Sequence, residues 1–369
     1  MRKIIVAGHL CLDIIPTWKN GKWEELLPGN LIITEGLKFS TGGCVSNTGI
    51  SLKKLGMDPI LIGKIGDDEI GKLITNIIES NGKNLSNHLV VGPNIHSSYT
   101  IVLSPPDADR SFLHYPGAND AFAANDIKFG DLKDSKIFHF GYPTLMKRMR
   151  ENDGEELVRV FDEAHDFKMV TSMDITMPDP FSDSSVRDWQ RLLKNVLPHT
   201  DIFFPSVREL FYMLDIELPF TVKKLRLASK KLIQWGTKMV VIKLGESGLY
   251  FRSGKLSDPL AKLIGERWSE KELLVPAFKV KVKGTTGAGD ASIAGFLTGL
   301  VEEMGPLKTL AIASATGAFC VEEIDSISGI KPLSTVLERI ERGWELITPQ
   351  LKIDNWERGD YGVFIGSYD

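Results

Sequence analysis

The second half of the chain alternates short, almost wholly apolar segments with longer segments in which apolar residues recur at helical spacing. The short segments predict buried strands and the longer ones predict helices. Because helices of this length separate consecutive strands, we expect parallel pairing through right-handed crossovers and a sheet covered on both faces. The predicted strands here are 137–140, 169–173, 202–204 and 239–243, and the predicted helices include 155–167, 186–196 and 307–321.

The first half of the chain predicts strands of two kinds. Residues 3–8 and 60–63 are apolar segments that end at glycine, as buried strands often do. Residues 97–103 instead alternate like an exposed strand, and residues 110–115 are expected to pair with them across a Pro-Pro-Asp turn at 105–107. In residues 14–38, short apolar pieces around Trp18 and Trp23 are separated by turn signals, which is typical of hairpins.

Composition narrows the class of protein. The 369 residues contain 43% hydrophobic and 25% charged side chains, which are ordinary globular values. A net charge of −4 without a long basic block argues against nucleic-acid or membrane-surface binding. The apolar segment after the first three residues is too short for a signal peptide, and no apolar run reaches membrane-spanning length. Three isolated cysteines suggest reduced thiols, so we expect a cytoplasmic protein.

A glycine-rich turn with one carboxylate precedes a strongly apolar helical segment. Residues 283–290 read Lys-Gly-Thr-Thr-Gly-Ala-Gly-Asp. Small residues let the backbone approach a ligand closely, and the first N–H groups of a helix attract anions such as phosphate. Asp290 would then stand beside the anion, where a carboxylate is useful for handling a proton. The turn alone also allows a simpler interpretation, in which Asp290 only stabilises the helix dipole.

Two stretches together resemble the signatures of the ribokinase-like (PfkB) carbohydrate kinases. Residues 285–290 fit the family's C-terminal signature Asp-Thr-x-Gly-Ala-Gly-Asp, although Gly284 stands where the family usually has its first Asp. Upstream, Gly42 and Gly43 precede Asn47, a helical pattern and Leu-Gly, as in the family's Gly-Gly-x-x-x-Asn signature.

The resemblance covers about residues 1–330 and implies a fold. That fold is a three-layer α/β/α domain around a mostly parallel, doubly covered sheet, with a small β-sheet lid whose closure keeps water from the transferring phosphoryl group. The expected kinase domain comprises residues 1–13, 41–93 and 119–335, the lid comprises 14–40 and 94–118, and 336–369 form a C-terminal extension of unknown role. Residues 254–272 are interpreted as a surface insertion, and the pattern leaves room for a homodimer.

The family's catalytic roles carry over to matching positions of the C-terminal signature. Asp290 is expected to act as the general base, and the N–H groups of Gly287, Ala288 and Gly289 to stabilise charge on the transferring phosphoryl group. The resemblance also implies a substrate site composed of Asp13, Gly42, Gly43, Asn47 and Asn119.

The resemblance further implies ATP and Mg²⁺ as cofactors. Lys243 and Gly245 match a segment that approaches the nucleotide, and Thr285 belongs to the turn. Ser206 replaces the family's usual Asn in Asn-x-x-Glu, while Glu209 keeps the Glu that supports the magnesium network. On spacing alone, Lys243 could simply cap a strand end. The Gly284 departure calls into question the monovalent-cation site that many members build beside the turn.

The sequence leaves the substrate open. A sugar or sugar acid is the first hypothesis, and a nucleoside is the second, since related kinases use the same fold and motif. A sugar acid would require an arginine near its carboxylate, and Arg110, Arg148 and Arg150 are candidates. A third hypothesis is a non-catalytic homologue that binds a sugar or nucleotide; the changes at positions 206 and 284 favour it, whereas the retained Asp290 opposes it.

Overall fold

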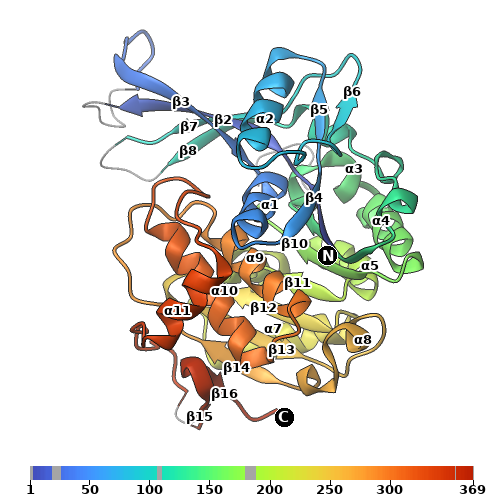
Figure 1. Ribbon diagram of the computed structural model, residues 1–369, viewed down its shortest axis with the longest axis vertical. Helices are drawn as coiled ribbons and strands as arrows, with labels where there is room; N and C mark the ends of the chain where they lie inside the picture. The colour runs from blue at the N-terminus through green and yellow to red at the C-terminus, as the bar shows by residue number, and fades with distance from the viewer. Residues whose placement is uncertain (1–2, 19–25, 106–109, 179–187, 354, 369) are drawn as a thin grey trace.

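A large sheet forms the centre of the molecule. The computed structural model describes residues 3–18, 26–105, 110–178, 188–353 and 355–368. Within them, ten strands form a main sheet in the order β15-β16-β14-β13-β12-β11-β10-β9-β1-β4 (Figure 1). Their bounds are β1 (Lys3–Gly8), β4 (Asp58–Ile62), β9 (Ser135–Gly141), β10 (Val170–Asp174), β11 (Ile202–Phe204), β12 (Met239–Lys243), β13 (Leu249–Ser253), β14 (Glu272–Val275), β15 (Glu357–Arg358) and β16 (Phe364–Ile365).

The main sheet has a parallel part and an antiparallel part. The strands from β4 to β12 pair in parallel, and those from β12 to β15 pair antiparallel. The expected mostly parallel sheet is therefore confirmed. The predicted strands of this sheet also agree with the structure to within two residues at each end.

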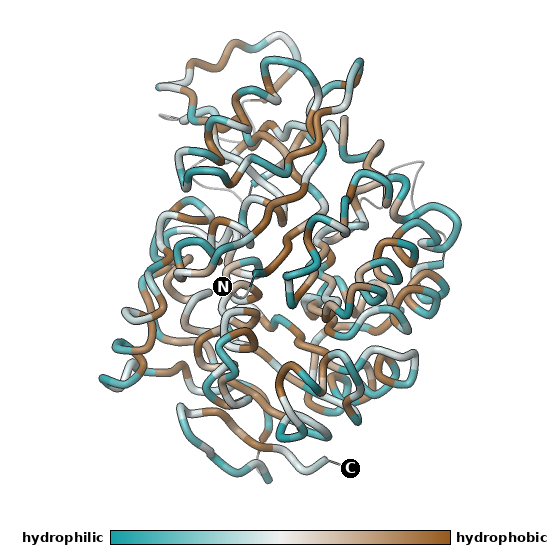
Figure 2. The backbone as a smooth tube through the Cα atoms, turned by 45° about the vertical axis from the view of Figure 1, so that its right-hand side comes forward, coloured by the Kyte–Doolittle hydropathy of each residue, from teal (hydrophilic) through white to brown (hydrophobic). Residues whose placement is uncertain are grey.

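Helices cover both faces of the main sheet, as predicted. Alternate side chains of β1 enter different cores: Ile4 and Val6 pack into one hydrophobic cluster, and Ile5 and Ala7 pack into the other. Figure 2 shows hydrophobic stretches running through the middle of the chain's fold. The helices are α1 (Cys44–Lys54), α2 (Glu69–Ser80), α3 (Lys147–Arg150), α4 (Glu155–Asp166), α5 (Trp189–Val196), α6 (Val207–Leu214), α7 (Val222–Gln234), α8 (Leu260–Ile264), α9 (Ala288–Val301), α10 (Pro306–Val321) and α11 (Leu333–Glu341).

A separate small sheet projects from one end of the molecule (Figure 1). Its strand order is β3-β2-β7-β8, with β2 (Cys11–Trp18), β3 (Thr34–Gly42), β7 (Tyr99–Leu103) and β8 (Ser111–Tyr115). This sheet fits the expected lid. Strands β2 and β3 reach further toward the main domain than the sequence suggests, so Asp13 and Gly42 lie on them and pair with Ser40 and Cys11. A third sheet pairs β5 (Lys64–Gly66) with β6 (Val90–Gly92).

Helices α9 and α10 pack against each other through small residues. A Cβ atom added at Gly295 of α9 would lie 2.7 Å from Oγ1 of Thr316, and one at Gly299 would lie 2.6 Å from Thr309. Both threonines are fully buried on α10. Glycine at these positions therefore allows the two backbones to approach closely, and any larger residue would force the helices apart.

Two parts of the chain that the sequence left unassigned belong to the core. The interpretation of residues 254–272 as a surface insertion is wrong, because Trp268 is fully buried with its ring 5.7 Å from those of Phe251 and Phe296. Trp268 stands among charged residues in the sequence, so the local pattern did not predict its burial. The C-terminal extension adds β15 and β16 to the sheet edge, and Tyr368 places its ring 4.4 Å from the guanidinium of the buried Arg252.

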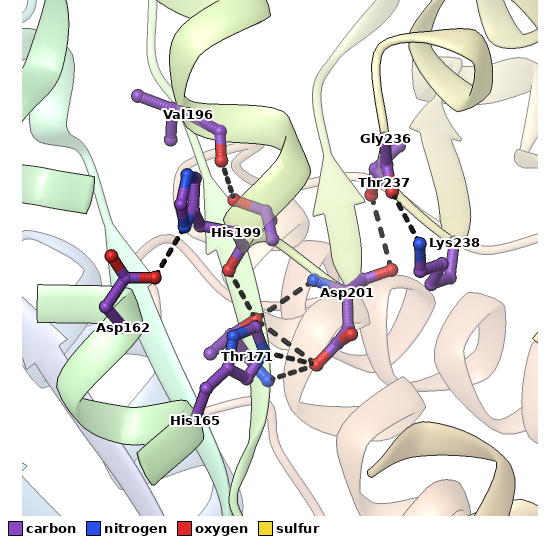
Figure 3. Close-up of polar contacts among 10 residues, drawn as sticks. Asp162, His165, Thr171, Val196, His199, Asp201, Gly236, Thr237 and Lys238 are labelled. Carbon is purple, nitrogen blue, oxygen red and sulfur yellow. Dashed lines mark hydrogen bonds and ion pairs between the residues drawn. The ribbon is translucent and has the colours of Figure 1, made fainter. Parts of the chain in front are cut away.

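The amino end of the parallel strands is held by a buried polar network (Figure 3). Oδ2 of Asp201 accepts hydrogen bonds from the N–H of Thr171 at 2.9 Å and from Nε2 of His165 at 3.1 Å. The N–H of Asp201 donates to Oγ1 of Thr171 at 3.0 Å. This network links α4 to the starts of β10 and β11, at the end of the sheet opposite the carboxyl ends of its strands.

The structure also answers the expectations about the cysteines and about membrane-spanning segments. Cys11, Cys44 and Cys320 are free and buried. Among the described helices, none is both long and apolar enough to cross a membrane. The predicted helix 186–196 appears as α5, and its first residues, together with Trp23 and most of the 105–107 turn, lie outside the described residues.

Candidate active site

Polar side chains stand at the carboxyl ends of four neighbouring parallel strands. Tyr142 follows β9, Asp174 ends β10, Ser206 follows β11 and Lys243 ends β12. Gly141 lies opposite Asp174 in the register of β9 and β10, and Ser206 forms a bridge with Lys243. Ligands of open α/β sheets bind at this edge, so the row marks the candidate site.

Asp290 lies in the first turn of α9 and joins this row. Its side chain is 3% exposed and accepts three hydrogen bonds. The donors are Nδ2 of Asn47 at 3.2 Å, Oγ1 of Thr48 at 3.1 Å and the hydroxyl of Tyr142 at 2.7 Å. Burial raises the pKa of Asp290, whereas these three donors and Lys243 act in the opposite direction. The carboxylate is thus fixed between α1, α9 and the sheet edge.

The turn before Asp290 has the geometry of an anion-binding helix start. Gly287 precedes α9 with φ 78°, a left-handed conformation that favours glycine. A Cβ atom there would lie 2.3 Å from Cβ of Ser326, so no side chain fits. Ala288 and Gly289 then open the helix at the positive end of its dipole. A Cβ atom on Gly289 would lie 3.5 Å from Nζ of Lys243, so the ammonium adjoins this turn.

Lys243 forms a buried ion pair with Asp174. Its Nζ lies 2.5 Å from Oδ1 of Asp174, which is 1% exposed. Burial raises the pKa of Asp174, and Asp290 and Glu209 add to this shift, whereas the paired ammonium of Lys243 opposes it and keeps the carboxylate ionised. Burial lowers the pKa of Lys243, but its three carboxylate neighbours outweigh burial and the pKa stands above its ordinary value. The lysine therefore stays protonated beside the turn.

Ser206 and Glu209 form a capping box at the start of α6. The N–H of Ser206 donates to Oε2 of Glu209 at 2.7 Å, and the N–H of Glu209 donates to Oγ of Ser206 at 3.3 Å. Serine thus serves as an ordinary helix cap at this position. The bond from the N–H of Ser206 occupies Oε2 of Glu209. The role expected of Glu209 from the sequence was an indirect one, in support of a bound metal.

The carboxylates around Lys243 are compatible with a cation held mainly by nucleotide phosphates. Three carboxylates, those of Asp174, Glu209 and Asp290, act electrostatically on the single ammonium of Lys243, so the cluster is acidic. In the part of the chain that the structure describes, no three His, Cys, Asp or Glu side chains are grouped to hold a metal ion. Magnesium is commonly bound by one or two carboxylates plus substrate phosphates, and these residues fit that pattern.

The remaining nucleotide-side residues are open to solvent or lack close neighbours. Gly245 has φ 63° and no heavy atom within 4 Å of an added Cβ, so the backbone beyond Lys243 is uncrowded. Thr285 is exposed, and its carbonyl accepts the N–H of Ala288 at 3.4 Å. Both residues therefore border the turn without being buried by it.

On the lid side, Asp13 rests directly on Gly42. A Cβ atom at Gly42 would lie 2.5 Å from Oδ2 of Asp13, so glycine is required for this contact. Gly43 caps α1 with φ 89°, and a Cβ there would lie 2.5 Å from the carbonyl oxygen of His9. Burial raises the pKa of Asp13 to about 6. With Asn47 on α1, these residues line the junction between lid and kinase domain.

Two histidines meet across that junction. Nε2 of His9, after β1, lies 3.4 Å from Nε2 of His114 on lid strand β8. Burial lowers the pKa of His9 to about 3 and also lowers that of His114, so both rings are neutral at pH 7. The ring of His9 also lies 6.0 Å from that of Tyr142, which connects the lid contact to the sheet edge.

The side chain of Asn119 binds the backbone of Leu10. It is fully buried, its Oδ1 accepts the N–H of Leu10 at 3.1 Å, and its Nδ2 donates to the carbonyl of Leu10 at 3.0 Å. The amide thus holds the backbone between β1 and β2. Oδ1 and Nδ2 can each make one more hydrogen bond, so the expectation that Asn119 also binds substrate stays a prediction.

Three residues that contact Asp290 or Lys243 were not predicted from the sequence. Tyr142 and Thr48 donate to Asp290, and Asp174 binds Lys243. A signal was present for two of them, because Tyr142 and Asp174 each stand at the end of a predicted strand. Thr48 directly follows Asn47 in α1, but nothing in its sequence context distinguishes it from an ordinary helical threonine.

Comparison with known proteins identifies the family of this chain. The sequence profile described as "pfkB family carbohydrate kinase" matches residues 1–332. Among curated proteins, a probable fructokinase of Arabidopsis thaliana (fructokinase-5) is 26% identical over 336 residues, covering 89% of this chain and 94% of that protein. The fold is that of the ribokinase-like kinases, and the chain belongs to the pfkB carbohydrate kinase family.

Solved structures show the same fold in kinases of different substrates. A ribokinase of Arabidopsis thaliana, complexed with ribose and ATP, has a TM-score of 0.71 at 20% identity, with 91% of this chain and 98% of that chain covered. A nucleoside kinase of Burkholderia thailandensis, in complex with inosine, has a TM-score of 0.66 at 18% identity, with 92% and 98% covered. These likenesses establish architecture and leave the acceptor to be argued from the site.

This chain has Gly284 where the family usually has Asp, and the difference has a steric reason. A Cβ atom at this position would lie 2.7 Å from the carbonyl oxygen of Ile324 and 3.1 Å from that of Glu323. Gly284 is buried, and the loop after α10 occupies the space that a side chain would need. The residues present therefore do not fit a monovalent-cation site that uses a carboxylate at position 284.

Proposed function

We propose that this carbohydrate kinase transfers the γ-phosphoryl group of ATP to a hydroxyl of an uncharged sugar, with Asp290 as general base. One observation carries the proposal: a single buried carboxylate directly follows the Gly287–Gly289 turn and contacts the carboxyl edge of the sheet. One helix end can then serve both reacting groups, because the base and the anion-binding N–H groups are consecutive in the chain.

The proton step requires a free lone pair on the base. Oδ2 of Asp290 accepts from Asn47 and Tyr142, whereas Oδ1 accepts only from Thr48 among the described residues. Each carboxylate oxygen can accept about two hydrogen bonds, so Oδ1 keeps room for the substrate hydroxyl. Asp290 takes up that proton as the oxygen attacks phosphorus, and a base of this kind contributes roughly 10²–10⁴-fold to the rate.

The phosphoryl group would be held by the α9 turn and Lys243. The N–H groups of Gly287, Ala288 and Gly289 and the adjoining ammonium supply positive charge where negative charge develops. The carboxylates near Lys243 would hold magnesium, which would supply positive charge that offsets the charge of the ATP phosphates. Gly245, Thr285 and Ser206 are the proposed neighbours of the nucleotide on this side.

Charge favours a neutral acceptor over a sugar acid. The proposed sugar site between lid and kinase domain contains Asp13, Asn47 and the two neutral imidazoles of His9 and His114. A substrate carboxylate would be repelled by ionised Asp13. Of the arginines considered from sequence, Arg150 donates to the carbonyl of Thr144 at 3.1 Å. Within the described ranges, Arg110 and Arg148 form no ion pair with Asp13 or Asp290.

Two alternatives keep specific support. A nucleoside acceptor is favoured by the structural likeness to the inosine-binding kinase. A non-catalytic sugar or nucleotide binder would explain a serine at position 206, but Ser206 is a good helix cap and Gly284 is sterically required, so neither change indicates loss of catalysis.

The test is ADP release from MgATP with a panel of neutral sugars, sugar acids and nucleosides, run with Asp290→Asn beside the wild type. We expect turnover with a neutral sugar and a loss of about 10²-fold or more in the variant. Asp126→Asn is the matched control, because this partly buried carboxylate pairs with Lys64 at 2.8 Å. Turnover with nucleosides alone would favour the first alternative. Ligand-induced thermal stabilisation without turnover would favour the second, and an active Asp290→Asn would refute the assigned base.

A further inference from the structure

Tyr142 has a backbone conformation that bulky residues seldom adopt. Its φ and ψ are 61° and 41°, in the left-handed region. Its N–H donates to the carbonyl of Asp174 at 3.1 Å, and Pro143 continues the chain into a 3₁₀ turn. Conformations of this kind persist only where the surroundings fix them, and they concentrate at functional sites. The fold thus holds this side chain in place at a local cost.

The side chain of Tyr142 ends on the proposed base. Its hydroxyl bond to Oδ2 of Asp290, at 2.7 Å, is the shortest of the three that this carboxylate accepts. Burial and the nearby carboxylates of Asp290 and Asp174 raise the pKa of Tyr142 well above its ordinary value. The phenol therefore keeps its proton and acts as a donor, so Tyr142 is not a second base.

Tyr142 differs from the other two donors to Asp290 in the element that carries it. Asn47 and Thr48 are neighbours on α1, so they hold Asp290 from one element. Among the described contacts of this carboxylate, Tyr142 supplies the bond that ties it to the end of β9. Without that bond, Oδ2 would keep one weaker donor and the carboxylate could rotate about its last bond.

We propose that Tyr142 is a positioning residue for the phosphoryl transfer: its hydroxyl fixes Oδ2 of Asp290 and so presents Oδ1 to the acceptor hydroxyl. The proposal rests on the assignment of Asp290 as base in the proposed function. A hydrogen bond to the ionised carboxylate also opposes the effect of burial on the pKa of Asp290, and thereby extends activity to lower pH.

The experiment is a pH–rate profile of Tyr142→Phe, using the full chain and the best neutral sugar of the panel. We expect the acid limb of kcat to move up by about one pH unit, as loss of one charge-assisted hydrogen bond implies. The KM for ATP should stay within about threefold. A profile identical to that of the wild type would overturn the proposal, as would an equal loss of rate at every pH.

Tyr250→Phe is the matched control. The Tyr250 hydroxyl donates to the buried carboxylate of Glu272 at 2.8 Å, so this variant also removes a buried tyrosine–carboxylate bond. We expect it to lower the melting temperature without moving the acid limb. An equal shift of the limb in Tyr250→Phe would show that general destabilisation causes the effect, and would overturn the role of Tyr142.

A second measurement separates this proposal from the proposed function. Carboxyl ¹³C resonances of labelled aspartate are titrated in the wild type and in Tyr142→Phe, with the Asp290 signal assigned by its absence in Asp290→Asn. We expect the Asp290 midpoint to rise by about one pH unit in Tyr142→Phe. An unchanged midpoint overturns the proposal even if no substrate turns over, whereas a shifted midpoint without turnover would leave the contact intact and refute the kinase assignment of the base.

Discussion

The hydroxyl of Ser326 donates a hydrogen bond to Oδ1 of Asn47 at 2.8 Å. The Asp290 carboxylate only accepts, so the Asn47 nitrogen faces Asp290, and the amide oxygen then faces the Ser326 hydroxyl, which holds it. Ser326 belongs to the loop after α10 that also packs against Gly287. One loop residue thus touches both the anion-binding turn and a partner of the proposed base.

Ser326→Ala should lower kcat by about tenfold. Without the hydroxyl, the Asn47 amide loses the partner of its oxygen and is held only by Asp290, so its side chain becomes more mobile and positions the base less firmly. The measurement is steady-state kinetics with ATP and sugar varied separately. Ser328→Ala on the same loop, which removes a hydroxyl bonded to the exposed side of Asp325, should keep wild-type kcat. Equal effects in the two variants would assign the loss to the loop as a whole.

Lys243→Met should impair both stability and ATP use. It leaves Asp174 buried without its ion-pair partner, which costs roughly 3–5 kcal/mol in unfolding free energy near neutral pH. It also removes a cation beside the α9 turn, so the KM for ATP should rise about tenfold or more. The checks are urea unfolding and ATP kinetics.

The double variant Asp174→Asn/Lys243→Met separates these effects. It should recover part of the stability, because no uncompensated carboxylate remains buried, but not the affinity for ATP. Full recovery of ATP kinetics in the double variant would contradict a role for Lys243 at the nucleotide.

Asp13→Asn should weaken sugar binding yet raise the melting temperature at pH 7.5. Burial holds the pKa of Asp13 at about 6, above its ordinary 3.8, so the folded protein binds this proton more tightly than the unfolded chain does. The ionised form therefore destabilises the fold above about pH 6, and this effect disappears as the pH falls toward 4. We expect a gain of roughly 2 °C at pH 7.5, about half of it at pH 5 and little near pH 4, and a KM for sugar about tenfold higher.

Asp325→Asn provides a control of opposite sign for that measurement. Burial disfavours the ionised form of Asp325, but hydrogen bonds from Ser328 and Ile327 outweigh it and lower the pKa to about 2. Its stabilising contribution is present above about pH 4 and is lost as the pH falls toward 2. The melting temperature of Asp325→Asn at pH 7.5 should therefore fall. A decrease in Asp13→Asn as well would show that Asp13 is stabilised by its surroundings, against our assignment.

Gly284→Asp should destabilise the protein without making it respond to K⁺. The new Cβ would lie 2.7 Å from the carbonyl oxygen of Ile324, and overpacking of this kind costs about 1–3 kcal/mol. The measurements are urea unfolding and turnover in KCl, NaCl and choline chloride. Gly130→Asp, at an exposed glycine with no atom within 4 Å of an added Cβ, is the control. K⁺-stimulated turnover of the wild type would show that the loop binds a cation without a carboxylate at 284.

Local pattern was enough to predict most of the fold. The buried strands and amphipathic helices repeat a hydrophobic period that is visible in a short window, and their order implies parallel pairing. The error at residues 254–272 came from the same rule, because charged neighbours surround the one tryptophan that enters the core. The pairing of β16 with β14 could not be predicted either, since two short strands 90 residues apart carry little periodic signal.

The candidate site was predictable where chemistry and backbone coincide. The turn before Asp290 needs glycine for its left-handed φ, so its sequence reveals it. Asn119 shows the limit: a buried amide can bind a ligand or a neighbouring backbone, and only the fold reveals that each of its polar atoms bonds to Leu10. The contact of Tyr142 with Asp290 joins residues 148 positions apart, which no local pattern encodes.

The close packing of α9 against α10 limits the motion of these two helices relative to each other during turnover. Gly295 and Gly299 leave no gap between the two helices, so the base and the anion-binding turn share a rigid frame with the loop that carries Ser326. Closure of the four-stranded lid would then bring the sugar to a stationary α9 turn. Structures with and without ligands, superposed on these two helices, would report that displacement directly.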